Sequence, residues 1–311
     1  MAEWLYEAGI GEARAALVED GAIVEAVIEI DDDALRLGET VSARLTAIGR
    51  QPRVTIAGQG EAMLATIPPG VTQGAMLNVA IVREAIPERG RPKLPKGVAS
   101  DAMPAPAPDL LARITAGGLP VRRLHAHEPD ALEAAGWSEL LEEAASGEIA
   151  FVGGALRLHV TPAMTLFDVD GDAPPASLAT AGATAAALAI RRMGIGGSIG
   201  IDFPTLANKA ERQAVVEAFD AALPPPFERT AVNGFGFLQV VRPRQRASLP
   251  ERLAADPAAA AARAMLRRLE RTPPPGVPVE RVGPALLAAL RPQWIAELHR
   301  RTGTATRFEA S

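Results

Sequence analysis

The chain contains no cysteine and few aromatic residues. Without cysteine, disulfide bonds and metal sites built from thiolates are excluded. Aromatic side chains make up 4% of the 311 residues, and the stretch 35–84 has no Phe, Tyr or Trp. Proteins that bind single strands usually stack bases on aromatic rings. A nucleic-acid contact in this stretch would therefore have to use Arg and Lys.

Long apolar runs are missing as well. No run of about 18 apolar residues occurs, so we expect no membrane-spanning helix. Residues 1–20 carry several glutamates and no long apolar core, so we expect no secretory signal peptide. Together with the absence of cysteine, this favours a cytoplasmic location. The net charge of −5 does not favour nucleic-acid binding by the whole surface, but it allows a local basic face.

The first third of the chain reads as β-structure. The length of the whole chain, 311 residues, predicts roughly two domains of about 150 residues each. Residues 12–19 and 22–30 flank Asp20-Gly21, a turn signal that predicts a hairpin. Residues 35–85 hold several short β-like runs separated by Gly- and Pro-containing turns, which is typical of a small β-barrel. Residues 87–108 are first basic and then rich in Pro and Ala, and they predict an extended linker.

The remainder alternates between strand and helix patterns. We expect a short helical region at 129–146, a hairpin at 149–160, a strand at 164–170, a helix at 178–193, a strand at 198–203, a helix at 208–223, strands within 230–241, and C-terminal helices at 257–271 and 282–302. Strand, helix, strand and helix in this order predict a parallel crossover. Trp137 and Trp294 fall in helical patterns and are predicted as core residues. His125 and His127 lack a third ligand at standard spacing and are interpreted as structural or surface residues.

Three carboxylates end the predicted strand 164–170. In the sequence MTLFDVDGD, Asp168, Asp170 and Asp172 follow an apolar run within five residues. Residues two apart share a face of a strand, so Asp168 and Asp170 point the same way. The next parallel strand ends at Asp202, which would lie beside Asp168 if the strands pair in that register. Such carboxylates suit Mg²⁺, although a solvated turn before Pro174-Pro175 and an ordinary strand-end Asp202 remain alternative interpretations.

An ordered series of motifs resembles the ribonuclease E/G family. The segments are EARAALVEDGAIVEAVIE at 12–29, VREAIPERGRPKL at 82–94, LFDVDGD at 166–172, GGSIGIDF at 196–203 and GFGFLQVVRPRQRASL at 234–249. The last three are similar to the family's "IDxN", "GGxIxIDF" and "RFGLLExxRQRxxxSL" segments. The family's paired zinc-binding cysteines and its 5′-end sensor region have no counterpart, so no zinc-linked dimer is expected.

The resemblance implies an α/β protein. Its parts would be an opening hairpin (1–34) of an RNase H-like mixed sheet, an inserted OB-type β-barrel (35–98), a linker (99–128), the RNase H-like catalytic domain (129–255) and a small C-terminal helical region (256–311). It also implies that Asp168 and Asp202 bind Mg²⁺. The family's asparagine near the metal maps onto Asp170, so a group that can donate a hydrogen bond becomes a carboxylate.

Two groups of basic residues are candidates for contact with an RNA backbone, and a third group lies beside Asp202. They are Arg83, Arg89, Arg91 and Lys93 near the end of the predicted barrel; Arg242, Arg244 and Arg246 in the last motif; and Lys209 and Arg212 at a helix start. Arginine and lysine neutralise phosphates in a salt-dependent way. For the first and third groups, a solvated charged surface is the competing interpretation.

The sequence thus predicts a Mg²⁺-dependent endoribonuclease that acts on single-stranded RNA. The alternatives are an RNA-binding homologue or assembly partner without cleavage, which the change from Asn to Asp170 favours, and a metal-dependent phosphoesterase for small substrates.

Overall fold

The computed structural model describes residues 1–88, 90, 92–273, 276 and 278–311. Residue contacts group the chain into two compact units. The first unit consists of Met1–Asp32, Leu110–Leu140 and Leu253–Ser311, and the second of Asp33–Asp109 and Leu141–Arg252. The helices α3 (Trp137–Ser146) and α6 (Leu249–Ala255) contain two of the points where the chain passes between the units.

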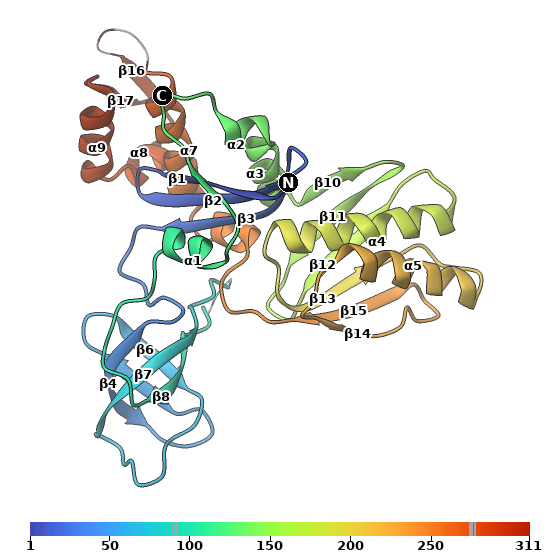
Figure 1. The fold of residues 1–311 in the computed structure, drawn as a ribbon, viewed down its shortest axis with the longest axis horizontal. Helices are drawn as coiled ribbons and strands as arrows, with labels where there is room; N and C mark the ends of the chain where they lie inside the picture. Colours follow the sequence, from blue (N-terminus) through green and yellow to red (C-terminus); the bar gives the residue numbers. More distant parts are fainter. Residues whose placement is uncertain (89, 91, 274–275, 277) are drawn as a thin grey trace. The chain divides into compact units, whose positions relative to one another are not determined.

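The first unit contains a four-stranded sheet with the order β3-β2-β1-β9, of which β1, β2 and β3 are labelled in Figure 1. Its strands are β1 (Glu3–Ala8), β2 (Glu12–Glu19), β3 (Ala22–Ile30) and β9 (Val121–Arg123). The predicted hairpin is confirmed, since β2 and β3 pair antiparallel across Asp20-Gly21. The sequence predicts this hairpin as part of the domain that holds the carboxylates. The hairpin also pairs with β1, whose mixed sequence EWLYEA carries no clear strand signal.

Helices and a short parallel strand pair complete this unit. They are α1 (Leu110–Ala116), α2 (Ala131–Ala134), α7 (Pro257–Arg271), α8 (Pro284–Ala289), α9 (Pro292–Thr302), β16 (Val279–Val282) and β17 (Arg307–Ala310). Trp294 of α9 is 4% exposed and packs with Ile10, Leu266 and Leu298. Trp137 is 1% exposed. The prediction that both tryptophans are core residues is confirmed.

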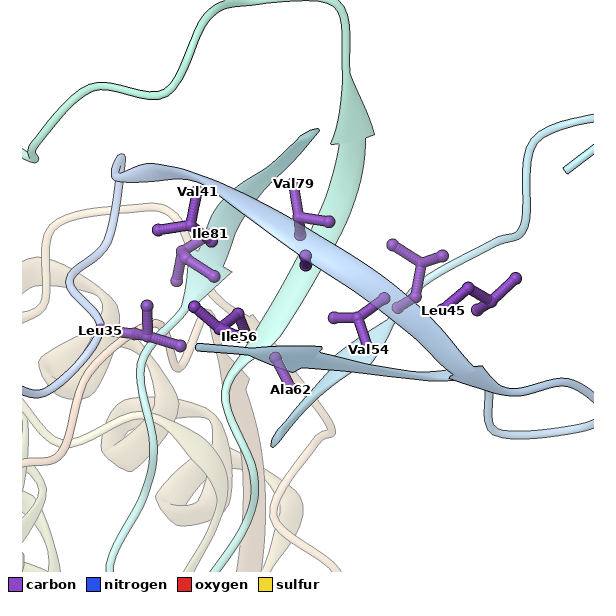
Figure 2. Close-up of a cluster of buried hydrophobic side chains, with 10 residues drawn as sticks. Leu35, Val41, Leu45, Val54, Ile56, Ala62, Val79 and Ile81 are labelled. Carbon is purple, nitrogen blue, oxygen red and sulfur yellow. The ribbon is translucent and has the colours of Figure 1, made fainter. Parts of the chain in front are cut away.

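The second unit contains a closed five-stranded barrel, which confirms the predicted barrel. Its strands are β4 (Thr40–Ala47), β5 (Arg53–Ile56), β6 (Gly60–Leu64), β7 (Met76–Arg83) and β8 (Lys96–Ser100). Period-2 alternation turns Val41, Ala43 and Leu45 of β4 inward, where they meet apolar side chains of β5 and β7 (Figure 2). The expectation of a linker at 87–108 is wrong for β8, which pairs with β7 and β6.

The same unit holds a six-stranded mixed sheet with the order β10-β11-β12-β13-β15-β14. Its strands are β10 (Glu148–Phe151), β11 (Gly154–Val160), β12 (Thr165–Asp170), β13 (Gly197–Asp202), β14 (Glu228–Arg229) and β15 (Phe237–Arg242). Strands β12 and β13 are parallel, and the other neighbours are antiparallel. The predicted crossover is confirmed, because α4 (Pro175–Arg192) connects the two parallel strands.

Helices α4 and α5 (Lys209–Ala222) lie side by side over one face of this sheet (Figure 1). Phe167 and Val169 of β12 and Ile199 and Ile201 of β13 are buried, and α4 packs against β10, β11 and β12. The strand residues that alternate with these buried positions point to the other face of the sheet. No helix among the described residues is long and apolar enough to cross a membrane.

A buried network of charged side chains joins α7 to the sheet of the first unit. The carboxylate of Glu7, 7% exposed, accepts hydrogen bonds from Arg14 at 2.5 Å, Arg267 at 2.9 Å and Arg271 at 2.8 Å. Glu12 accepts from Arg263 at 2.6 Å. Burial raises the pKa of Glu7, but the three guanidinium groups outweigh this effect, so its pKa lies below the usual value. Breaking a buried ion pair on one side typically costs about 3–5 kcal/mol.

We expect Glu7→Gln to destabilise the protein at neutral pH by about 3 kcal/mol, because three buried guanidinium groups lose their counter-charge. Since the pKa of Glu7 is lower in the folded state, the stabilisation from its charge is present above the pKa of the unfolded chain and is lost as pH falls through the folded pKa. The variant should therefore lose less stability than the parent on acidification below about pH 4.3. Urea unfolding at several pH values measures this effect, with Glu3→Gln on the same strand as the control. If the unfolding free energy of the parent and of Glu7→Gln falls equally as pH decreases, the prediction is wrong.

Candidate metal and RNA site

Two of the predicted carboxylates lie side by side in the six-stranded sheet. Asp168, near the end of β12, and Asp202, the last residue of β13, are paired in the parallel register. The predicted register is therefore confirmed. Both side chains are exposed, on the face opposite α4 and α5, because their neighbours Phe167, Val169 and Ile201 are buried. Adjacent strands are about 4.8 Å apart, so the two carboxylates repel each other unless a cation lies between them.

The third carboxylate, Asp170, has a cation beside it. Arg157 of β11 lies opposite Asp168 in the antiparallel register. Its guanidinium is 3.2 Å from the carboxylate of Asp170, while the other Asp170 oxygen accepts a hydrogen bond from the Gly171 amide at 3.0 Å. Both side chains are at least half exposed, so this pair contributes little to stability. It does offset the charge that Asp170 adds next to Asp168.

The donor set suits a small hard cation. Mg²⁺ takes oxygen ligands, usually one or two protein carboxylates, and keeps several waters. Among the described residues, neither Asp168 nor Asp202 has a hydrogen-bond or ion-pair partner that would compete for such an ion. Within the same residues, no group of three or more His, Asp or Glu side chains is placed to hold a metal ion. Asp168 and Asp202 thus form a pair without a third acidic neighbour of this kind among the described residues, and Asp172 is exposed in the following turn.

The arginines of the last motif are largely engaged in ion pairs within the second unit. Arg244 contacts Glu88 at 3.2 Å and also pairs closely with Glu251. Arg246 is 3.0 Å from Glu84. Arg242, at the end of β15, reaches the Ile195 carbonyl at 3.4 Å. Arg244 and Arg246 thus join the loop after the barrel strand β7 to the segment after β15.

The basic residues near the barrel exit are likewise held in place. Arg83 donates to the Leu94 carbonyl at 2.7 Å, and Lys93 is 2.6 Å from Glu88. Burial and the neighbouring Arg244 lower the pKa of Arg83. Arg89 and Arg91 lie outside the described residues.

Two predicted basic residues lie at the start of α5, after the strand that ends in Asp202. Lys209 is exposed and has no ion-pair partner among the described residues. Arg212 is partly buried and reaches the Leu206 carbonyl at 3.4 Å. Of these two, Lys209 is the one whose charge is free to meet a phosphate.

Comparison of the chain with protein-family models gave no match, and comparison with curated proteins gave none either. The resemblance to the ribonuclease E/G family therefore rests on the sequence motifs.

Two other candidates do not contribute to this site. His125 and His127 are exposed, and their rings stack at 5.6 Å, as expected of surface residues. A pocket of about 370 Å³ is lined by residues of the first unit, including Tyr6, Arg271 and Arg301. Both of these arginines are already paired with glutamates, Arg271 with Glu7 and Arg301 with Glu270.

Glu84 forms a buried contact that no sequence pattern signals. It is 5% exposed, and its two carboxylate oxygens contact Arg246 at 3.0 Å and Arg252 at 3.1 Å. Its amide also donates to the Gln245 carbonyl at 2.9 Å. The carboxylate comes from the loop after β7 and the arginines lie far along the chain, so no local signal reveals the contact.

We expect Glu84→Gln to destabilise the protein by about 3 kcal/mol, since it leaves two largely buried arginines without their counter-charge. Glu61→Gln is the matched control, because Glu61 forms an exposed pair with Arg53 at 3.3 Å whose loss should cost less than about 1 kcal/mol. The shift in unfolding midpoint in urea measures both effects. Equal midpoints for the two variants would show that Glu84 does not stabilise the contact between the loop after β7 and the segment after β15.

Proposed function

We propose that this protein is a Mg²⁺-dependent endoribonuclease of the ribonuclease E/G type that acts on single-stranded RNA. The observation that carries the proposal is the side-by-side placement of Asp168 and Asp202 on the open face of the sheet. The motif series supports it from the sequence. A cytoplasmic location belongs to the same proposal.

Fold assignments follow from this proposal. We assign the barrel as OB-type, which its five strands and closure support. We assign the six-stranded sheet as RNase H-like, which its mixed strand directions and its parallel pair support.

In this proposal Asp168 and Asp202 hold the metal ion. A bound Mg²⁺ supplies a Lewis acid that neutralises phosphate charge and lowers the pKa of bound water. The protein's own part is to keep the two carboxylates in register and exposed. Arg157 holds Asp170 by an ion pair, and Lys209 offers a positive charge to the RNA backbone.

The rival proposal is an RNA-binding homologue or assembly partner without cleavage. It is favoured by Asp170, which cannot donate the hydrogen bond that the family's asparagine can. A substrate phosphate would meet a third carboxylate here, and the exposed pair with Arg157 offsets its charge only in part.

We expect millimolar Mg²⁺ to raise the unfolding temperature, by linkage worth about 1.4 kcal/mol at ten times the dissociation constant. Asp168→Asn and Asp202→Asn should each remove this stabilisation together with any cleavage of a 5′-monophosphorylated, AU-rich single-stranded oligonucleotide. Asp172→Asn is the control and should keep both. If Asp202→Asn keeps the full stabilisation by Mg²⁺, Asp168 and Asp202 do not form the metal site.

Asp170→Asn decides between the enzyme and its rival. It restores the family's residue and breaks only an exposed ion pair, so stability should change by less than about 1 kcal/mol. If the carboxylate impairs catalysis, Mg²⁺-dependent cleavage should be faster in the variant than in the parent. Bound but uncut RNA with both proteins, over the full Mg²⁺ titration, supports the rival.

Lys209→Gln should weaken RNA binding and reduce the slope of log affinity against log salt by about 0.7, as expected for one lost phosphate contact on a single strand. Arg307→Gln removes the same charge from β17 in the first unit and is the control for net charge. Anisotropy titrations of a labelled single-stranded RNA at several salt concentrations measure both. An unchanged slope in Lys209→Gln would show that the phosphates lie elsewhere.

A further inference from the structure

An exposed aromatic side chain lies beside the end of the strand that carries Asp202. Phe235 is 87% exposed, although the burial of an apolar side chain is favourable. It lies in the turn that precedes β15, two residues before Phe237, which is the antiparallel partner of Asp202. An exposed aromatic residue therefore lies in the turn beside the end of the strand that carries Asp202.

The turn around Phe235 is held by several hydrogen bonds. The side-chain oxygen of Asn233 accepts from the amides of Phe235 at 2.9 Å and Phe237 at 3.1 Å. The Gly236 carbonyl accepts from the Phe203 amide at 3.1 Å, which ties the turn to the residue after Asp202. Gly236 has a φ of +92°, and a Cβ there would lie 2.4 Å from the Phe203 carbonyl oxygen. The turn thus lies against the end of β13 at a position where a residue other than glycine would not fit without strain.

A second aromatic ring covers the neighbouring part of the same face. Gly200 lies two residues before Asp202, so both point to the open face. A Cβ at Gly200 would lie 2.4 Å from the ring of Phe237 and 2.8 Å from the side chain of Leu166. The absence of a side chain at Gly200 lets that ring and Leu166 meet over the strand. They form a partly exposed apolar surface beside Asp168 and Asp202.

We propose that Phe235, together with the apolar surface of Phe237 and Leu166, binds an unpaired nucleobase of the strand whose phosphate lies at the carboxylate pair. This inference rests on the proposed function and names how that site selects its substrate. Every base has an aromatic face, so stacking accepts any sequence but requires a base that is not paired in a duplex. The contact would also supply the aromatic platform that the barrel stretch 35–84 lacks.

The test is the affinity of the full chain for a fluorescein-labelled, 2′-O-methyl single-stranded RNA that resists cleavage, measured by anisotropy in millimolar Mg²⁺. Phe235→Ala should weaken binding about 5- to 150-fold, which corresponds to about 1–3 kcal/mol for one stacked base. Phe235→Trp should keep the affinity. Val152→Ala is the matched control, because Val152 is 95% exposed in another turn of the same sheet. The unfolding temperatures of all four proteins should agree.

Two further measurements separate stacking from charge. The salt slope should be the same for Phe235→Ala and the parent, since no cation is lost. A ribose-phosphate oligomer of the same length without bases should bind the parent and Phe235→Ala equally weakly. If the parent binds single-stranded RNA and Phe235→Ala binds it equally well, the stacking site is overturned and the proposed function stands. If the parent binds no RNA at any salt concentration, the stacking site and the proposed function are both overturned.

Discussion

The candidate site depends on the burial of one face of the six-stranded sheet. Helices α4 and α5 cover that face, and strand residues alternate between the two faces. Once Phe167 and Ile201 are committed to the core, their neighbours Asp168 and Asp202 must point to the open face. A slip of one residue in β13 would bury Asp202, at a cost of several kcal/mol for an unpaired charge. The hydrophobic core therefore sets the register that brings the two carboxylates together.

The parallel crossover adds the second requirement. Because β12 and β13 run in the same direction, both strands end at the same edge of the sheet. That edge is where open α/β sheets place their ligands. The antiparallel neighbours then supply different side chains to the same face, with Arg157 from β11 and Phe237 from β15. Charged and aromatic groups are thus arranged around the pair by strand pairing alone.

Sequence patterns predicted those parts of the structure that depend on local periodicity. The hairpin at Asp20-Gly21, the helix Pro257–Arg271 and the pairing of Asp168 with Asp202 follow from alternation, turn residues and helical spacing. The strand Lys96–Ser100 was missed because it is short, contains glycine and follows a Pro-rich segment. Its strand conformation comes from pairing with β6 and β7, which a local pattern does not contain.

Charged residues show the same limit more clearly. Arg244 and Arg246 fall in a motif that suggested phosphate contacts, yet their ion-pair partners Glu84, Glu88 and Glu251 are set by tertiary structure. Glu84 and Arg246 are 162 positions apart in the chain, so no spacing rule connects them. A sequence does not distinguish an arginine that is available to bind phosphate from one that forms a structural ion pair. Burial and ion-pair partners in the structure separate the two roles. Lys209 is the opposite case, a basic residue that is exposed and has no ion-pair partner among the described residues.

Electrostatic balance also explains how a third carboxylate can stand beside the pair. Asp170 points to the same face as Asp168, so without compensation it would add like charge next to a charged site. Arg157 lies across from Asp168 in the register and turns its guanidinium to Asp170. The arginine thus takes up one of the three charges through an exposed pair that costs little to rearrange. Asp168 and Asp202 remain uncompensated, and two carboxylates are the number that a single hydrated Mg²⁺ commonly takes from a protein.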